Sequence, residues 1–209
     1  MKQILFLAII LINTTLFAQQ SKPIKNAQKF QDKLNKEFAA KEKSPLTEDD
    51  LKKFKALDFF PIDTNYIVTA KLKFFENSKS FKMQTTTDRL PVYKIYASAT
   101  FKIKGVEHVL HIYQNQKLLI TDDFEDFLFL PFTDKTNAES TYGGGRYIDL
   151  KTTTEDTIVI DFNRAYNPYC AYNGKYSCPI PPKANHLNIE INAGVKAYKS
   201  VDDLKTRKF

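Results

Sequence analysis

The spacing of apolar residues in this chain changes once, near residue 60. Before that point apolar residues recur every three or four positions, and after it they recur at every second position. The first spacing is typical of an amphipathic helix and the second of a strand with one buried face. No long helical pattern separates the later strands, which disfavours parallel β-α-β units. We therefore expect a mainly β fold: a single antiparallel β-barrel or sandwich domain with two short N-terminal helices.

The two helices are predicted from different features. Over about 24–43 an apolar stripe is flanked by lysines, which predicts an amphipathic helix. Pro45 interrupts this pattern, and Thr47 is followed by three acidic residues. A threonine N-cap with acids in the first turn predicts a second, short helix that ends near Ala56. Packing against the rest of the domain is the expected role of both helices.

A strand is predicted over 66–74 and a hairpin over 93–114. In the hairpin, Lys104-Gly105 forms a two-residue turn, which pairs Ile103 with Val106, Phe101 with His108 and Ser98 with His111. Alternation along a strand then sends His108 and His111 to opposite faces, so a two-histidine metal site is not expected. Further short strands are expected at 118–120, 127–130, 146–150, 157–162 and 187–191.

Residues 1–18 have the layout of a secretory signal peptide, with Lys2, an apolar run from Ile4 to Ile12 and a small residue at Ala18. The run is shorter than the ~20 residues that span a bilayer, and no later segment could cross a membrane as a helix. We expect cleavage after Ala18 and export to the periplasm or the extracellular space. The chain then divides into a signal peptide (1–18), a helical segment (19–57) and a β-rich domain (58–209).

The net charge of +7 is typical of proteins that bind polyanions. However, four of the 31 basic residues are arginine, and the lysines are scattered among acidic residues. Scattered lysine is typical of a solvated surface, so specific nucleic-acid binding is not expected. We find no cofactor or metal motif, and the glycine run at 143–145 lacks the Lys-Ser/Thr of a phosphate-binding Walker loop. A small-molecule ligand remains the expected partner.

Both cysteines and four of the eleven tyrosines fall between residues 166 and 178. In an oxidising compartment, a disulfide between Cys170 and Cys178 is the expected state. The alternative is a reactive or metal-binding thiol pair, but seven intervening residues fit neither the Cys-x-x-Cys redox spacing nor a zinc knuckle.

The strands at 146–150 and 157–162 are predicted to form one hairpin. Aligning their apolar residues places Arg146 opposite Phe162 and Gly145 opposite Asn163, so the glycine run should meet the segment 163–168. Glycine amides could form a nest for an anion, and two arginines would lie near a carboxylate. The candidate ligand-binding residues are Gly143, Gly144, Gly145, Arg146, Asp161, Asn163, Arg164, Tyr166 and Asn167.

Several motifs carry a resemblance to a known family: Gly-Gly-Gly-Arg-Tyr at 143–147, Asp-Phe-Asn-Arg-Ala-Tyr-Asn-Pro at 161–168, and Ser-Cys-Pro-Ile-Pro-Pro at 177–182. Phe-Phe-Pro-Ile-Asp at 59–63 and Pro-Phe-Thr-Asp-Lys-Thr at 131–136 precede them. Together they resemble the bacterial family known as domain of unknown function 1684, over about residues 50–198. The resemblance implies no particular activity.

Three hypotheses about the residue cluster remain open. The first is a binding module for an anionic or sugar-like small molecule, with Arg146 and Arg164 as anion contacts. The second is a hydrolase-like enzyme in which Asp161 is the candidate catalytic residue, although no nucleophile motif accompanies it. The third is a network of buried polar residues that only stabilises the fold.

Overall fold

The structure, a computed structural model, describes residues 22–120 and 123–200. The signal peptide predicted over 1–18 lies outside the described residues. Eight strands form one curled sheet in the order β6-β5-β4-β3-β1-β7, with β2 added to β3 and β8 added to β5. The strands are β1 (Ile67–Phe74), β2 (Phe81–Lys82), β3 (Val92–Ile103), β4 (Val106–Asn115), β5 (Phe127–Asp134), β6 (Arg146–Lys151), β7 (Thr157–Asp161) and β8 (His186–Leu187).

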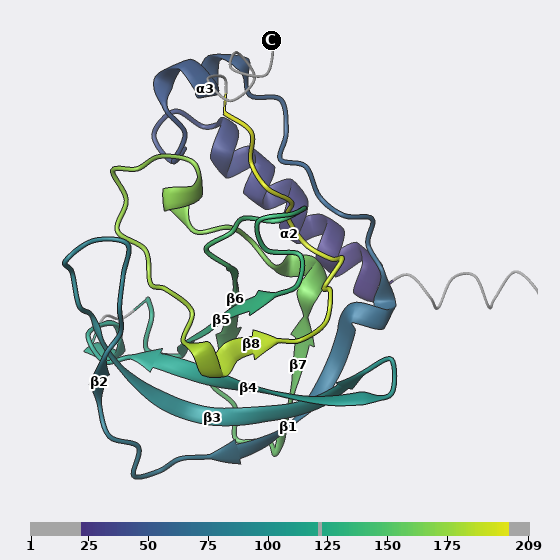
Figure 1. Cartoon of the computed structure of the whole chain (residues 1–209), viewed down its shortest axis with the longest axis vertical. Helices are drawn as coiled ribbons and strands as arrows, with labels where there is room; N and C mark the ends of the chain where they lie inside the picture. Colours follow the sequence, from purple (N-terminus) through teal and green to yellow (C-terminus); the bar gives the residue numbers. More distant parts are fainter. Residues whose placement is uncertain (1–21, 121–122, 201–209) are drawn as a thin grey trace, which may run out of the picture.

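The sheet is antiparallel apart from the short parallel pair β5 and β8, which confirms the mainly β, antiparallel class. It is an open half-barrel rather than the closed barrel or sandwich that we expected (Figure 1). The reason lies at its two end strands. Strand β7 stops at Asp161, whose side chain caps the 3-10 turn Phe162–Arg164, so the chain leaves the ladder before β7 can pair along β6.

The hairpin of β3 and β4 has the predicted register. Ile103 pairs with Val106, Phe101 with His108 and Ser98 with His111. The turn residues Lys104 and Gly105 have φ values of +50° and +80°. Two positive φ values twist the turn in the sense that matches the twist of the flanking strands, which is why a local sequence signal was sufficient here.

The predicted hairpin between 146–150 and 157–162 is wrong. Strand β6 pairs with β5, from Phe127 opposite Lys151 to Phe132 opposite Arg146, while β7 pairs with β1. Two smaller expectations also fail: residues 118–120 form a 3-10 turn, and the strand expected at 187–191 is reduced to the two residues of β8.

Asn185 fastens β4 to β5 where their pairing ends. These two strands pair at Tyr113 and Phe129. Beyond this pair, Asn185 Nδ2 donates to the carbonyls of His111 at 2.8 Å and Pro131 at 2.7 Å, and Asn185 Oδ1 accepts from the His111 amide at 2.9 Å. Pro131 has no amide to donate, so a fully buried side-chain amide takes over the role of the ladder at this point.

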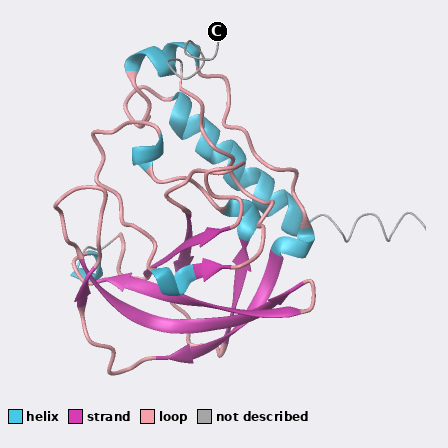
Figure 2. Ribbon diagram, viewed as in Figure 1, coloured by secondary structure: helices cyan, strands magenta, loops and turns pink. Residues whose placement is uncertain are grey.

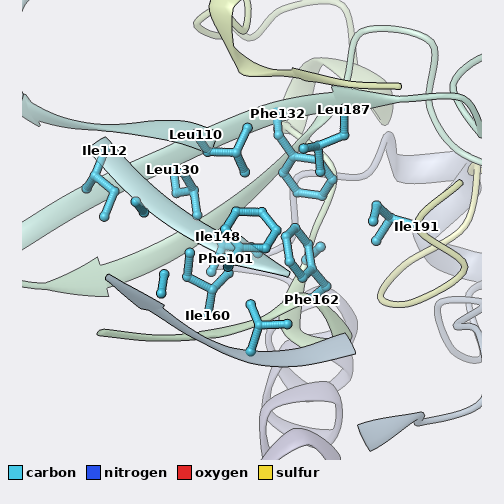
Figure 3. Packing of buried hydrophobic residues seen from close by; sticks show 14 of the residues in the cluster. Phe101, Leu110, Ile112, Leu130, Phe132, Ile148, Ile160, Phe162, Leu187 and Ile191 are labelled. Carbon is cyan, nitrogen blue, oxygen red and sulfur yellow. The ribbon is translucent and has the colours of Figure 1, made fainter. Parts of the chain in front are cut away.

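The main core fills the inside of the curl. Figure 3 shows side chains from several strands meeting there, and the labelled residues are Phe101, Leu110, Ile112, Leu130, Phe132, Ile148, Ile160, Phe162, Leu187 and Ile191. Each is at most 3% exposed. Full burial of such a side chain contributes about 1.5–3 kcal/mol, so this cluster dominates the stability of the sheet.

Two helices, α2 (Lys22–Ala39) and α3 (Glu48–Lys53), precede the sheet, as predicted, and Thr47 caps α3 through the amide of Asp50 at 3.2 Å. Figure 2 shows loops filling the space between α2 and the strands. A second apolar cluster fixes α2 there, in which Phe38 packs edge-to-face against Tyr172 with ring centroids 4.7 Å apart. Helix α2 is therefore held by the long loop segment after β7.

Candidate functional site

Arg146, which we expected to contact an anion, is completely buried at the start of β6. Its Nη2 donates to Asp134 Oδ2 at 2.8 Å and to the Ile191 carbonyl at 2.9 Å, and its Nη1 donates to the Ala193 carbonyl. Asp134 Oδ1 accepts from the hydroxyl of Thr136 at 2.6 Å. The guanidinium thus ties three segments of backbone together inside the protein, as in the structural hypothesis.

Asp161 and Asn163 form a second, separate network. Asp161 Oδ1 accepts from the Asn163 amide at 3.0 Å and from Asn163 Nδ2 at 2.9 Å. Asn163 also exchanges two hydrogen bonds of 2.9 Å with the backbone of Asp63, and Gln31 of α2 donates to its carbonyl. Burial raises the pKa of Asp161, against the effect of these hydrogen bonds. These contacts join the end of β7 to the segment before β1.

Within the glycine run at 143–145, Gly145 serves a close approach of two strands, whereas Gly143 and Gly144 are exposed. Gly145 has φ of +88°, and a Cβ at this position would lie 2.6 Å from the carbonyl oxygen of Phe132 in β5. Its other near neighbours are Pro181 and Thr133, not Asn163 as the predicted hairpin required. Glycine is needed here because its missing side chain lets β6 start against β5.

The remaining candidates differ in where they point. Asn167 is buried and donates to the Lys196 carbonyl at 3.0 Å. Arg164 stacks over the ring of Phe30 at 5.1 Å from its centroid. Of the predicted ligand-binding residues, Tyr166 lines a pocket.

That pocket has a volume of about 400 Å³ and lies on the face of β5 and β6 that points away from the main core. Phe129 and its partner Asp149 lie on this face, while Leu128 and Leu130 point into the core. Helix α2 and the loops around 89 and 166–179 complete the walls. Eight aromatic rings line it: Phe30, Tyr93, Phe127, Phe129, Tyr147, Tyr166, Tyr169 and Tyr176.

A carboxylate and a phenol form the polar centre of this pocket. The Tyr166 hydroxyl donates to Asp149 Oδ1 at 2.5 Å. Asp149 is open to solvent through the pocket, but the surrounding protein removes much of its hydration and raises its pKa, while the bond from Tyr166 and the charge of Arg164 act in the opposite direction. The same desolvation, with Asp149 nearby, raises the pKa of Tyr166 well above 10.0. Tyr166 therefore stays a proton donor to Asp149 at neutral pH.

The fold positions this pair through a single backbone bridge. The Tyr147 amide donates to the Tyr166 carbonyl at 2.9 Å, and the Tyr166 amide donates back at 3.0 Å. This bridge joins β6 to the chain that follows β7, the two ends of the half-barrel. Two residues further along β6 lies Asp149, so the bridge sets the distance between the phenol and the carboxylate.

Charged side chains stand at the edge of the pocket. Lys33 and Glu37 come from α2, and Arg89 comes from the loop between β2 and β3. Arg89 is held by Ser177, to whose carbonyl its Nη2 donates at 2.7 Å. The pocket thus combines donors at its edge with an acceptor at its centre.

Our sequence analysis missed Asp149 and Arg89. The signal for Asp149 was present, since a lone acid between the apolar residues Ile148 and Leu150 shares a strand face with Tyr147. For Arg89 the sequence offered only its rarity as one of four arginines.

The cysteines are free thiols, so the expected disulfide is not formed in the structure. Cys178 lines the pocket, and its Sγ accepts a hydrogen bond of 3.2 Å from the backbone amide of Cys170. Within the described ranges, no three His, Cys, Asp or Glu residues gather in a way that could hold a metal ion. None of the helices in those ranges is long and apolar enough to cross a membrane.

Fold and site together define an open antiparallel half-barrel with an aromatic pocket on its outer face. The chain belongs to the family described as "Protein of unknown function (DUF1684)", whose model matches residues 52–196, and this confirms the resemblance seen in the motifs. Helix α2, which lies before the matched residues, contributes Phe30 and Lys33 to the pocket.

A solution NMR structure of an uncharacterized protein from gene locus rrnAC0354 of Haloarcula marismortui is similar to this chain. The two share 32% sequence identity with a TM-score of 0.65, over 82% of this chain and 92% of the other. No curated protein matches the chain.

Proposed function

We propose that this protein is an exported small-molecule-binding module whose ligand is an uncharged, sugar-like ring held in the aromatic pocket. One observation carries this proposal. The carboxylate of Asp149 accepts a hydrogen bond from Tyr166 inside a pocket lined by eight aromatic rings. Aromatic faces pack against the C–H surface of a sugar, and a carboxylate accepts hydrogen bonds from its hydroxyl groups. A volume of about 400 Å³ falls within the range of small-ligand pockets.

An anionic ligand is less well supported. Asp149 would repel a negative charge at the centre of the pocket, and Arg146 is committed to the buried Asp134. Anion contacts would have to come from Arg89 and Lys33 at the edge. The hydrolase alternative used Asp161 with Arg146 and Arg164. The charge of Arg164 acts on Asp161, but Arg146 belongs to a separate network, so we do not pursue this alternative.

Export is proposed from the sequence pattern of residues 1–18. The test is N-terminal sequencing of the protein recovered from the periplasm or the medium of the expressing bacterium. A mature N-terminus just after Ala18 supports export. Intact Met1 with all protein in the cytoplasm overturns it.

Binding is tested by isothermal titration and saturation-transfer NMR against a panel of neutral mono- and disaccharides and their acidic counterparts. We expect a neutral sugar to bind, and Asp149→Asn and Tyr166→Phe to weaken its affinity at least about tenfold through lost charge-assisted hydrogen bonding. Asp156→Asn, at an exposed position outside the pocket, is the matched control. If no neutral sugar binds, or if both pocket variants bind like the wild type, the proposal is wrong.

A further inference from the structure

Cys178 lines the pocket, and Cys170 lies beside it. Cys170 belongs to the 3-10 turn Tyr169–Ala171, and the Cys170 amide donates to Cys178 Sγ at 3.2 Å. Cys170 is half-buried, whereas Cys178 is 6% exposed. Cys170 is therefore the more exposed residue of the pair, and Cys178 is the more buried one.

The surroundings of the two sulfurs make them chemically unequal. The Cys178 thiol and the Tyr142 hydroxyl, which lies 3.8 Å from Cys170 Sγ, both donate toward Cys170. These donors lower the pKa of Cys170 to about 6. The same hydrogen bond, together with burial, raises the pKa of Cys178, so the proton of the pair resides on Cys178. Tyr142 remains a donor because burial raises its pKa to about 12.

We propose that Cys170 and Cys178 are a redox-active dithiol that exchanges with low-molecular-weight disulfides. The Cys170 thiolate attacks one sulfur of the small disulfide, whose S–S bond breaks and releases one thiolate. That thiolate takes up the Cys178 proton, and the resulting Cys178 thiolate attacks Cys170 Sγ. The second small molecule leaves as a thiolate and takes a proton from water. The protein dithiol is oxidised to a disulfide, and one small disulfide is reduced to two thiols.

In this proposal Cys170 is the attacking thiol and Cys178 is the resolving thiol. A nucleophilic cysteine needs thiolate character and access, which Cys170 has, and the resolving partner needs proximity, which Cys178 has. The exchange would also act on the pocket, because Cys178 and Tyr169, the neighbour of Cys170, both line it. The proposal is independent of any sugar ligand, since the reaction requires none.

The test uses the purified full chain, first reduced and then incubated at pH 7 with oxidised glutathione. Samples are quenched in acid and analysed by mass spectrometry. We expect the wild type to lose two hydrogen masses per chain, reversibly on addition of reduced glutathione. Cys178→Ser should instead accumulate a mixed glutathione disulfide on Cys170, because the resolving thiol is absent.

Cys170→Ser is the matched variant, since it retains only the buried thiol. It should form the mixed disulfide at least about tenfold more slowly than Cys178→Ser. Tyr142→Phe keeps both cysteines and removes one donor, so iodoacetamide should alkylate its Cys170 more slowly at pH 6 than that of the wild type. The proposal is overturned if folded wild-type protein forms no intramolecular disulfide, or if Cys170→Ser reacts as fast as Cys178→Ser.

Discussion

The hydroxyl of Tyr166 donates a hydrogen bond of 2.5 Å to the carboxylate of Asp149, next to the backbone bridge that joins the two ends of the half-barrel. Tyr166 belongs to the chain that leaves β7, and Asp149 belongs to β6, at the other end of the sheet order. The polar centre of the pocket therefore exists because the sheet curls far enough for its ends to meet at one point. Any change that opens the curl should separate these two groups.

Asp149→Asn should alter how stability depends on pH. The pKa of Asp149 is raised above 3.8 in the folded protein, mainly because the surrounding protein removes part of the hydration of the carboxylate. A carboxyl with a raised folded-state pKa contributes stability that is fully present below its unfolded pKa and is lost as pH rises through its folded pKa. The asparagine removes this loss. The Tm of Asp149→Asn relative to wild type should therefore increase between about pH 3.5 and about pH 7.

Thermal unfolding by circular dichroism at several pH values measures this difference. Asp156→Asn, which removes an exposed carboxyl, should follow the wild-type curve much more closely. If the Tm difference between Asp149→Asn and wild type were the same at every pH, the environment of Asp149 would not disfavour its charge.

Arg146→Met should strongly destabilise the fold. It leaves Asp134 buried and without its cation, and breaking a buried ion pair in this way costs about 3–5 kcal/mol. Lys151→Met breaks the pair with Asp126, which is exposed, and should cost less than about 1 kcal/mol. Urea denaturation gives both free energies of unfolding. Similar losses in the two variants would contradict the structural role of Arg146.

Gly145→Ala should be destabilising where Gly174→Ala is not. The alanine Cβ at 145 would meet the Phe132 carbonyl at 2.6 Å in a backbone with φ of +88°, whereas nothing lies within 4 Å of a Cβ at 174. The left-handed backbone alone costs about 1–2 kcal/mol, and displacement of the β5 carbonyl adds to it. Chemical denaturation should show Gly174→Ala within about 0.5 kcal/mol of wild type. A neutral Gly145→Ala would mean that β6 does not start against β5.

Phe38→Ala should loosen α2 without unfolding the sheet. Phe38 is buried against Tyr172 in the smaller apolar cluster, and such a truncation costs about 3–5 kcal/mol locally. Hydrogen exchange should accelerate in α2 while amides of β3 and β4 stay protected. Ile24→Ala, at a residue that is 41% exposed on the same helix, is the control. Equal acceleration in helix and sheet would show that the two unfold as one unit.

Local signals were predictable from sequence, and long-range partners were not. The register of β3 and β4 follows from the turn at Lys104-Gly105, which lies between the strands it joins. For β6, the alternation of Ile148 and Leu150 indicated which face is buried but did not indicate which strand is the neighbour. That ambiguity produced the wrong hairpin and, with it, the wrong surroundings for Arg146.

The candidate site was displaced for the same reason. Placing β6 beside β7 put Arg146, Asp161 and the glycines at one end of a hairpin. In the structure β6 lies beside β5, Arg146 and Asp161 belong to separate hydrogen-bond networks, and Gly145 packs against β5. Tyr166 remained at the pocket because it follows β7 in either arrangement. Asp149 was overlooked because a single carboxylate in a strand stands out only when the residues facing it across the sheet are known.

Helix α2 contributes to the pocket from outside the residues that the family model matches. The residues matched by the family, 52–196, supply the floor of the pocket, whereas Phe30, Lys33 and Glu37 cover it from a segment that the match leaves out. Substitution of Phe30, Lys33 or Glu37 would therefore change what the pocket accepts without altering the main core or the buried pair of Arg146 and Asp134.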